Sequence, residues 1–139
     1  MMTYKLSLDN LTPLVAKFGR KINSGVVILR GELAAGKTTL VKAVVKAMGI
    51  EDDVTSPTFS LQQVYGGKIY HYDLYNHGLE HFISLGMLEE LEKEGIHFVE
   101  WGDDALAALL EDAGIETTII EIEKISDDMR EYKVKYAHT

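Results

Sequence analysis

The feature that most constrains this chain is the stretch Gly31-Glu32-Leu33-Ala34-Ala35-Gly36-Lys37-Thr38, which fits the pattern G-x-x-x-x-G-K-[ST]. Residues 26–29 before it form the continuous apolar run of a buried strand, and residues 37–48 after it have the apolar spacing of a helix. In such a strand–loop–helix, successive backbone N–H groups surround nucleotide phosphates and the helix N-terminus faces them. The sequence therefore predicts a binding site for a nucleoside triphosphate.

Within this candidate phosphate loop (residues 31–38), Lys37 is expected to reach the β- and γ-phosphates and the Thr38 hydroxyl to ligate Mg²⁺. Many loops of this kind carry glycine where this chain has Ala34, so a turn there must be made with negative φ or at some strain. The alternative is a glycine-containing turn followed by an ordinary amphipathic helix. The remaining loop residues expected around the phosphates are Glu32, Leu33, Ala34, Ala35 and Gly36.

Composition limits the remaining possibilities. Hydrophobic residues make up 46% of the 139 positions, which suits one domain spanning residues 1–139. There is no cysteine, so disulfides and thiolate metal sites are excluded, and no apolar run approaches the roughly 18 residues of a membrane span. A soluble, cytoplasmic protein without membrane contact is expected. The net charge of −8, with scattered basic residues, argues against tight direct binding of RNA or DNA.

The order of the elements indicates an α/β fold: a sheet that is parallel at its centre, with helices on both faces. Gly66-Gly67 predicts a hairpin turn between two strands, and a break is expected at Gly86. The last two strands are expected to be antiparallel and to lie at a sheet edge, and Asp9 or Asn10 is placed to cap the first helix. The expected strands are 26–29, 61–65, 68–72, 96–99, 117–122 and 132–136, and the expected helices are 11–22, 37–48, 79–91 and 105–110.

A phosphate loop needs a carboxylate nearby, to hold Mg²⁺ through water or to orient an attacking water. Two predicted strands are each followed by a carboxylate residue: Asp73 follows the strand 68–72, and Glu100 follows the strand 96–99. Ligands of open α/β sheets lie beyond the carboxyl ends of the strands, so either carboxylate could reach the phosphates. The segment 55–59 (Thr-Ser-Pro-Thr-Phe) is either a switch whose hydroxyl senses the γ-phosphate or a Ser-Pro turn docked by Phe59. The five histidines have no metal-ligand spacing, and His71 and His97 are expected to be either core groups or hydrogen-bonded surface groups.

The arginines are Arg20, Arg30 and Arg130, and no segment resembles the arginine-bearing lid of a small kinase. We therefore expect slow hydrolysis by the isolated chain, because an arginine supplied in trans can be worth roughly 10³–10⁵ in turnover. Arg130 is the one plausible distant helper in cis. The chain has no Asn-Lys-x-Asp motif for guanine, which favours ATP.

Four motifs of the chain have the order and spacing of one known family: the candidate phosphate loop, Ser56-Pro57-Thr58-Phe59, His71-Tyr72-Asp73-Leu74-Tyr75 and Glu100-Trp101. The chain resembles this family, the TsaE (YjeE) ATPases, over nearly its whole length. The resemblance implies a P-loop NTPase-like three-layer fold with antiparallel edge strands. It also implies an accessory ATPase that docks on the TsaD–TsaB complex, supports repeated rounds of threonylcarbamoyladenosine synthesis, and meets tRNA only through that complex.

The resemblance also implies roles for single residues. Gly36, Lys37, Thr38 and Thr39 would hold the phosphates, Thr38 and Glu100 would serve Mg²⁺, and Asp73, Thr58, Trp101, Asn10 and Arg130 would lie near the nucleotide. The chain departs from the family pattern at Asn76, where the family has arginine, and at Glu32 and Ala34. Two alternatives remain: a nucleotide-gated binding module in which hydrolysis is incidental, and a small-molecule kinase.

Overall fold

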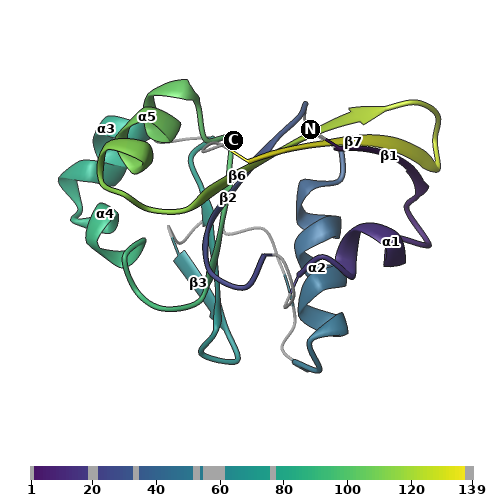
Figure 1. Cartoon of the computed structure of the whole chain (residues 1–139), viewed down its shortest axis with the longest axis horizontal. Helices are drawn as coiled ribbons and strands as arrows, with labels where there is room; N and C mark the ends of the chain where they lie inside the picture. The colour runs from purple at the N-terminus through teal and green to yellow at the C-terminus, as the bar shows by residue number, and fades with distance from the viewer. Residues whose placement is uncertain are drawn as a thin grey trace.

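The computed structural model describes residues 2–18, 22–32, 35–51, 54, 62–75 and 78–136. Its strands form one seven-stranded sheet in the order β1-β7-β6-β2-β5-β4-β3 (Figure 1). The strands are β1 (Met2–Ser7), β2 (Gly25–Arg30), β3 (Gln62–Tyr65), β4 (Ile69–Asp73), β5 (Ile96–Glu100), β6 (Thr117–Lys124) and β7 (Met129–Tyr136). The helices are α1 (Thr12–Val15), α2 (Lys37–Ala47), α3 (Gly78–Ser84), α4 (Met87–Glu90) and α5 (Asp104–Asp112).

The centre of the sheet is parallel, as predicted: β6, β2, β5 and β4 run in one direction. The outer pairs β1–β7, β7–β6 and β3–β4 are antiparallel. Because the central strands share a direction, the carboxyl ends of β2, β4 and β5 meet at one edge of the sheet, where α/β folds bind their ligands.

Helices cover both faces of this sheet, which confirms the predicted α/β class. On one face α1 and α2 pack against side chains such as Val27 and Leu29 of β2. On the other face α3, α4 and α5 pack against Val26 and Ile28 of the same strand (Figure 1). A central parallel strand buried on both faces has to be apolar at every position, which explains the unbroken apolar run of β2.

The first predicted helix is much shorter than expected. The spacing predicts a helix over residues 11–22, but α1 ends at Val15, and Phe18 pairs with Ile22 in an isolated β-bridge. Both side chains are nevertheless buried in the core beneath α2. The apolar spacing over residues 11–22 therefore predicts correctly which side chains are buried. It does not require a continuous helix, because these side chains reach the core without one. The N-cap residue is Leu11, while the Asn10 side chain accepts a hydrogen bond from the Thr12 N–H at 3.4 Å.

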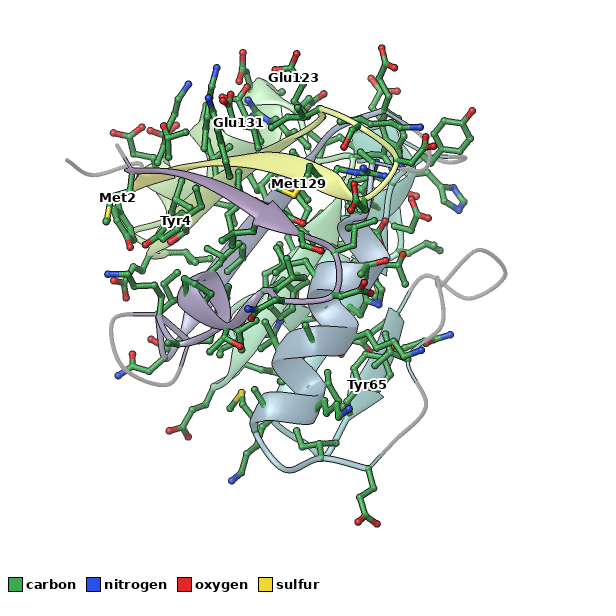
Figure 2. All side chains as sticks on the ribbon, turned by 90° about the vertical axis from the view of Figure 1, so that its right-hand side faces the viewer. Met2, Tyr4, Tyr65, Glu123, Met129 and Glu131 are labelled. Atoms are coloured by element: carbon green, nitrogen blue, oxygen red, sulfur yellow. The ribbon has the colours of Figure 1, made fainter. Side chains whose placement is uncertain are left out.

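The prediction that both C-terminal strands lie at a sheet edge is wrong. β6 pairs in parallel with β2 and antiparallel with β7, and β7 pairs on its other side with β1, so both strands lie inside the sheet. The edge position belongs to β1, which the sequence analysis did not assign, and Figure 2 shows Met2 and Tyr4 on this strand beside β7. The alternation of apolar and polar residues over Met2–Ser7 is the pattern of a half-buried strand.

The predicted hairpin and helix break are confirmed. Gly66 and Gly67 both have positive φ, at 60° and 66°, and the Lys68 N–H closes the turn by donating to the Tyr65 carbonyl at 3.2 Å. This backbone geometry is the one that favours glycine in a hairpin turn. Gly86, with φ of 75°, separates α3 from α4. In the described part of the chain, no helix has the length and apolar character needed to cross a membrane.

Candidate functional site

The candidate phosphate loop joins the end of β2 to the start of α2, as the sequence predicts. Gly36 is the N-cap of α2 and has φ of 106°, a backbone conformation that side-chain-bearing residues rarely adopt. A Cβ at Gly36 would also lie 3.3 Å from the Leu8 side chain, so the loop end is packed against the segment that follows β1. Leu33 and Ala34 lie outside the described residues.

Lys37 is held at the mouth of this loop. Its side chain is 5% exposed, and its Nζ donates hydrogen bonds to the carbonyls of Gly31 at 2.7 Å and Glu32 at 2.9 Å. Burial lowers the pKa of Lys37, while the charges of Glu100 and Asp73 act in the opposite direction. The loop therefore presents a cation, beside two carboxylates, at the N-terminus of α2.

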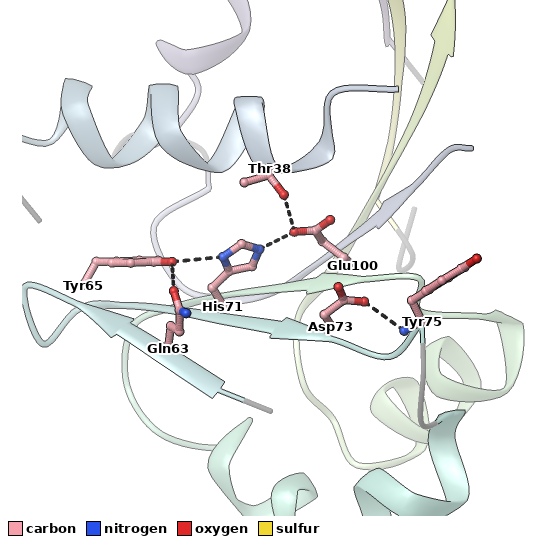
Figure 3. Close-up of polar contacts among 7 residues, drawn as sticks. All are labelled: Thr38, Gln63, Tyr65, His71, Asp73, Tyr75 and Glu100. Atoms are coloured by element: carbon pink, nitrogen blue, oxygen red, sulfur yellow. Dashed lines mark hydrogen bonds and ion pairs between the residues drawn. The ribbon is translucent and has the colours of Figure 1, made fainter. Parts of the chain in front are cut away.

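The two predicted carboxylates and the predicted metal-binding hydroxyl meet at the carboxyl edge of the sheet (Figure 3). Asp73 and Glu100 are the last residues of β4 and β5 and are paired in the ladder. The Thr38 hydroxyl donates to Glu100 Oε2 at 2.9 Å, and the Tyr75 N–H donates to Asp73 Oδ1 at 2.8 Å. The fold thus brings Thr38 and Glu100, the residues expected to serve Mg²⁺, into direct contact.

Trp101 closes one side of this site. It has φ of 66°, a left-handed conformation that costs roughly 1–3 kcal/mol outside glycine. The turn is maintained by its N–H, which donates to the Leu29 carbonyl at 3.1 Å, and by a ring contact with Tyr75 at 4.8 Å between centroids. Lys37 Nζ lies 4.1 Å from the centroid of the indole ring. A strained backbone at this point therefore places the ring against the loop cation.

Arg130 lies behind the candidate phosphate loop. Its side chain is 5% exposed, its Nε donates to the Ala35 carbonyl at 2.9 Å, and its Nη1 donates to the Ser126 carbonyl at 2.6 Å. The residue therefore connects the loop to the turn between β6 and β7. These contacts make Arg130 a brace for the loop backbone.

We expect Arg130→Lys to lower the free energy of unfolding by about 1.5–3 kcal/mol, the usual value of charge-assisted hydrogen bonds. An ammonium group cannot reproduce the separated Nε and Nη1 donors of the guanidinium. Urea unfolding measures the loss. Arg30→Lys is the control: Arg30 donates from Nε to the Gly102 carbonyl at 3.0 Å and pairs with the exposed Asp104. It contacts fewer backbone carbonyls than Arg130, and an exposed ion pair contributes about 1 kcal/mol or less, so its loss should be smaller. Equal losses in the two variants would contradict the bracing role.

Asn10 and Thr39 lie on the other side of the loop. A groove of about 960 Å³ runs between residues 8–18 and α2, and Thr39 contributes to it from the first turn of the helix. Asn10 lies between Asp9 and Leu11, two residues that line this groove. Thr58, the rest of the 55–59 segment and Asn76 lie outside the described residues.

The sequence analysis missed a buried polar network behind Glu100. His71 on β4 is fully buried and bonds through Nε2 to Glu100 Oε2. Its Nδ1 lies 3.2 Å from the Tyr65 hydroxyl, which donates to Gln63 Oε1 at 2.6 Å (Figure 3). The two-residue spacing of His71 and Asp73 places both on one face of a strand, and this spacing was the available signal.

His97 forms a second buried network on the opposite face of the sheet. Its Nε2 donates to the Lys93 carbonyl at 2.8 Å, so Nδ1 accepts from the Tyr72 hydroxyl, also at 2.8 Å. The Tyr70 ring stacks on the imidazole at 4.2 Å between centroids. Both histidines are therefore core groups, which is one of the two alternatives left open by the sequence, and both make polar contacts there.

His97 should make stability depend on pH. Burial lowers the pKa of folded His97 below its ordinary value of 6.5, so the unfolded chain binds more protons than the folded chain below about pH 6.5. Stability from this group is therefore complete above pH 6.5 and is lost as the pH falls through the folded pKa. Chemical unfolding at pH 7 and pH 5 should show a larger loss for the unmodified protein than for His97→Gln, by at most about 1.4 kcal/mol per pH unit. Identical pH dependence in the two proteins would refute this assignment.

The sequence pattern of one family, described as "Threonylcarbamoyl adenosine biosynthesis protein TsaE", matches residues 7–132. A protein of Treponema pallidum named "tRNA threonylcarbamoyladenosine biosynthesis protein TsaE" is 39% identical over 84% of this chain and 86% of its own length. A relative of the same name from Haemophilus influenzae is 34% identical, over 62% of this chain and 57% of its own length.

The crystal structure of YdiB from Bacillus subtilis superposes with a TM-score of 0.68 at 26% identity. That superposition covers 98% of this chain and 85% of YdiB. Two findings indicate the same family: the family pattern spans almost all the described residues, and one relative is 39% identical over 84% of the chain. The chain belongs to the TsaE family.

Proposed function

We propose that this chain binds ATP with Mg²⁺, hydrolyses it slowly on its own, and serves as an accessory subunit in the synthesis of threonylcarbamoyladenosine in tRNA. The name of its relatives supports the biosynthetic role. The observation that carries the ATPase role is the cluster of Lys37, Thr38 and Glu100 at the carboxyl edge of a parallel sheet. In this proposal the architecture is the P-loop NTPase-like three-layer fold.

The residues present fit a magnesium nucleotide. Thr38 Oγ1 and the Glu100 carboxylate supply the hard oxygen ligands that Mg²⁺ prefers, and phosphate and water oxygens complete such a site. The hydroxyl proton of Thr38 points to Glu100, which leaves the lone pairs of Oγ1 free to face a cation. When bound, Mg²⁺ would neutralise charge on the β- and γ-phosphates.

Side chains and backbone groups of this chain would bind the phosphates and orient the attacking water. Lys37 and the backbone N–H groups at the start of α2 would hold the phosphates and stabilise charge on them. Asp73 and Glu100 lie side by side at the strand ends, where either can orient the attacking water. Thr58, on the candidate switch segment, would sense the γ-phosphate.

The nucleoside part would occupy the groove between residues 8–18 and α2. Thr39 follows the phosphate-binding residues and lines this groove, so the base and ribose would leave the phosphates in this direction, past Asn10. Arg130 would act on the nucleotide through the loop backbone that it braces at Ala35.

The partners in this proposal are TsaD and TsaB, in the cytoplasm, and tRNA is met only through their complex. The net charge of −8 agrees with a chain that does not itself grip tRNA phosphates.

Trp101 provides the test, because its ring lies 4.1 Å from the ammonium that would bind phosphate. We expect a change in Trp101 fluorescence on adding ATP with Mg²⁺, and slow phosphate release that changes when purified TsaD and TsaB are added. Fluorescence that does not respond to ATP, together with no detectable binding of a labelled nucleotide, would exclude the ATPase proposal. Binding with partner-independent turnover would exclude the accessory role alone.

A further inference from the structure

We infer that His71 is a positioning residue that fixes the Glu100 carboxylate in its metal-binding orientation, and that His71 thereby sets the affinity of the site for the divalent cation. This inference rests on the proposed function, because it concerns the same magnesium nucleotide site. It assigns a task to a side chain that contacts neither the phosphates nor the metal in that proposal.

The first step in the argument is the way the two donors share one carboxylate oxygen. Thr38 Oγ1 and His71 Nε2 both bond to Glu100 Oε2, from α2 and from β4 respectively (Figure 3). A carboxylate oxygen accepts hydrogen bonds, so an Nε2–H group of His71 is the donor that suits this contact. In the described part of the chain no donor contacts the other oxygen, Oε1. Two donors on one oxygen fix the plane of the carboxylate and leave Oε1 as the available ligand.

The second step is that His71 is itself held in place. The imidazole is fully buried, and its Nδ1 faces the Tyr65 hydroxyl from the neighbouring strand β3. Tyr65 is fixed in turn by its hydrogen bond to Gln63. Nε2 bonds to Glu100 and Nδ1 lies against the Tyr65 oxygen, so the ring has a polar contact at each end that a rotation would break. Partners of this kind, one shell behind a metal ligand, orient that ligand.

The third step is a comparison within the molecule. His97 is equally buried, and it also faces a tyrosine hydroxyl through Nδ1 and bonds through Nε2. The difference is the group at Nε2: for His97 it is the Lys93 carbonyl, and for His71 it is Glu100. Substitutions of the two histidines should therefore disturb the core alike but affect the cation site differently.

The experiment uses the full chain and Mn²⁺ as the probe cation. Electron paramagnetic resonance follows Mn²⁺ binding to the protein–ATP complex, and a fluorescent ATP analogue in EDTA measures nucleotide binding without metal. For His71→Phe we expect Mn²⁺ affinity to fall about 10- to 100-fold, the usual range for partners of a metal ligand. Nucleotide affinity in EDTA should stay within about twofold. His71→Gln, which can still donate to Glu100, should recover at least half of the loss on a logarithmic scale.

The control is His97→Phe, for which we expect a comparable fall in thermal stability and unchanged Mn²⁺ affinity. Tyr65→Phe is the milder second variant if His71→Phe does not fold, and we expect it to weaken Mn²⁺ binding by up to about 10-fold. Unchanged Mn²⁺ affinity in His71→Phe, or in Tyr65→Phe where that variant alone folds, would overturn the positioning role. So would an equal loss of affinity in His97→Phe.

The unmodified protein separates this outcome from failure of the proposed function. If it binds the ATP analogue and Mn²⁺ normally while the His71 variants match it, the positioning role alone is wrong. If the unmodified protein binds no ATP, the magnesium nucleotide site is wrong and the positioning role falls with it.

Discussion

Replacing Lys37 by alanine is expected to lower the rate of ATP hydrolysis roughly 10²- to 10³-fold, the effect of removing one preorganised group that stabilises developing charge. The ammonium is held at the loop mouth by the Gly31 and Glu32 carbonyls, so it is already in place when phosphate arrives. Phosphate release under saturating ATP measures the rate, and a fluorescent ATP analogue measures binding, which should weaken as well.

Lys68→Ala is the matched control for this substitution. Lys68 is an exposed cation in the turn between β3 and β4, so removing it changes the net charge equally without touching the loop. We expect wild-type hydrolysis from it. A Lys37→Ala protein that folds and hydrolyses ATP at the wild-type rate would show that catalysis takes place elsewhere.

Glu100→Gln should have the second large effect, again a loss of hydrolysis of roughly 10²- to 10³-fold. The amide oxygen of glutamine can still accept from Thr38, but the charge that would face Mg²⁺ is gone. ATP binding in EDTA should persist, because Lys37 and the start of α2 remain. Glu123→Gln, on an exposed part of β6, is the control and should hydrolyse ATP normally.

The same Glu100→Gln protein distinguishes the two roles that nucleotide could have. If hydrolysis resets the complex, tRNA modification by TsaD and TsaB with this variant should stop after one round. If ATP only orders a docking surface, modification should continue over many rounds. Counting modified tRNA molecules per complex gives the answer, and continued turnover would favour the nucleotide-gated binding module.

Local sequence was sufficient to predict the central part of the fold. The apolar run of β2, the loop glycines and the helical spacing of α2 are all encoded within a few residues of one another. The edge of the sheet was not predictable in this way. The position of β6 depends on its pairing with β2 and β7, and such contacts between distant segments leave no local pattern in either strand.

The contacts of the candidate site also fall into two groups, those that sequence reasoning could predict and those that it could not. Thr38, Asp73 and Glu100 meet because parallel strands end at one edge, a rule that sequence reasoning can apply. The bond between His71 and Glu100 was not predicted, since it depends on which face of β4 turns toward α2. The contact of Arg130 with Ala35 likewise depends on where β7 lies relative to the loop.

The two buried histidine networks have a consequence for the way the sheet assembles. Along β4, His71 and Asp73 face α2, while Tyr70 and Tyr72 face the opposite side, where Tyr72 meets His97. A slip of β4 by one residue along β5 would exchange the two faces of the strand. Such a slip would leave the polar groups of both networks unpaired inside the protein, which is costly at each of them. These hydrogen bonds therefore add to the apolar pattern in favouring the observed register of β4 on β5.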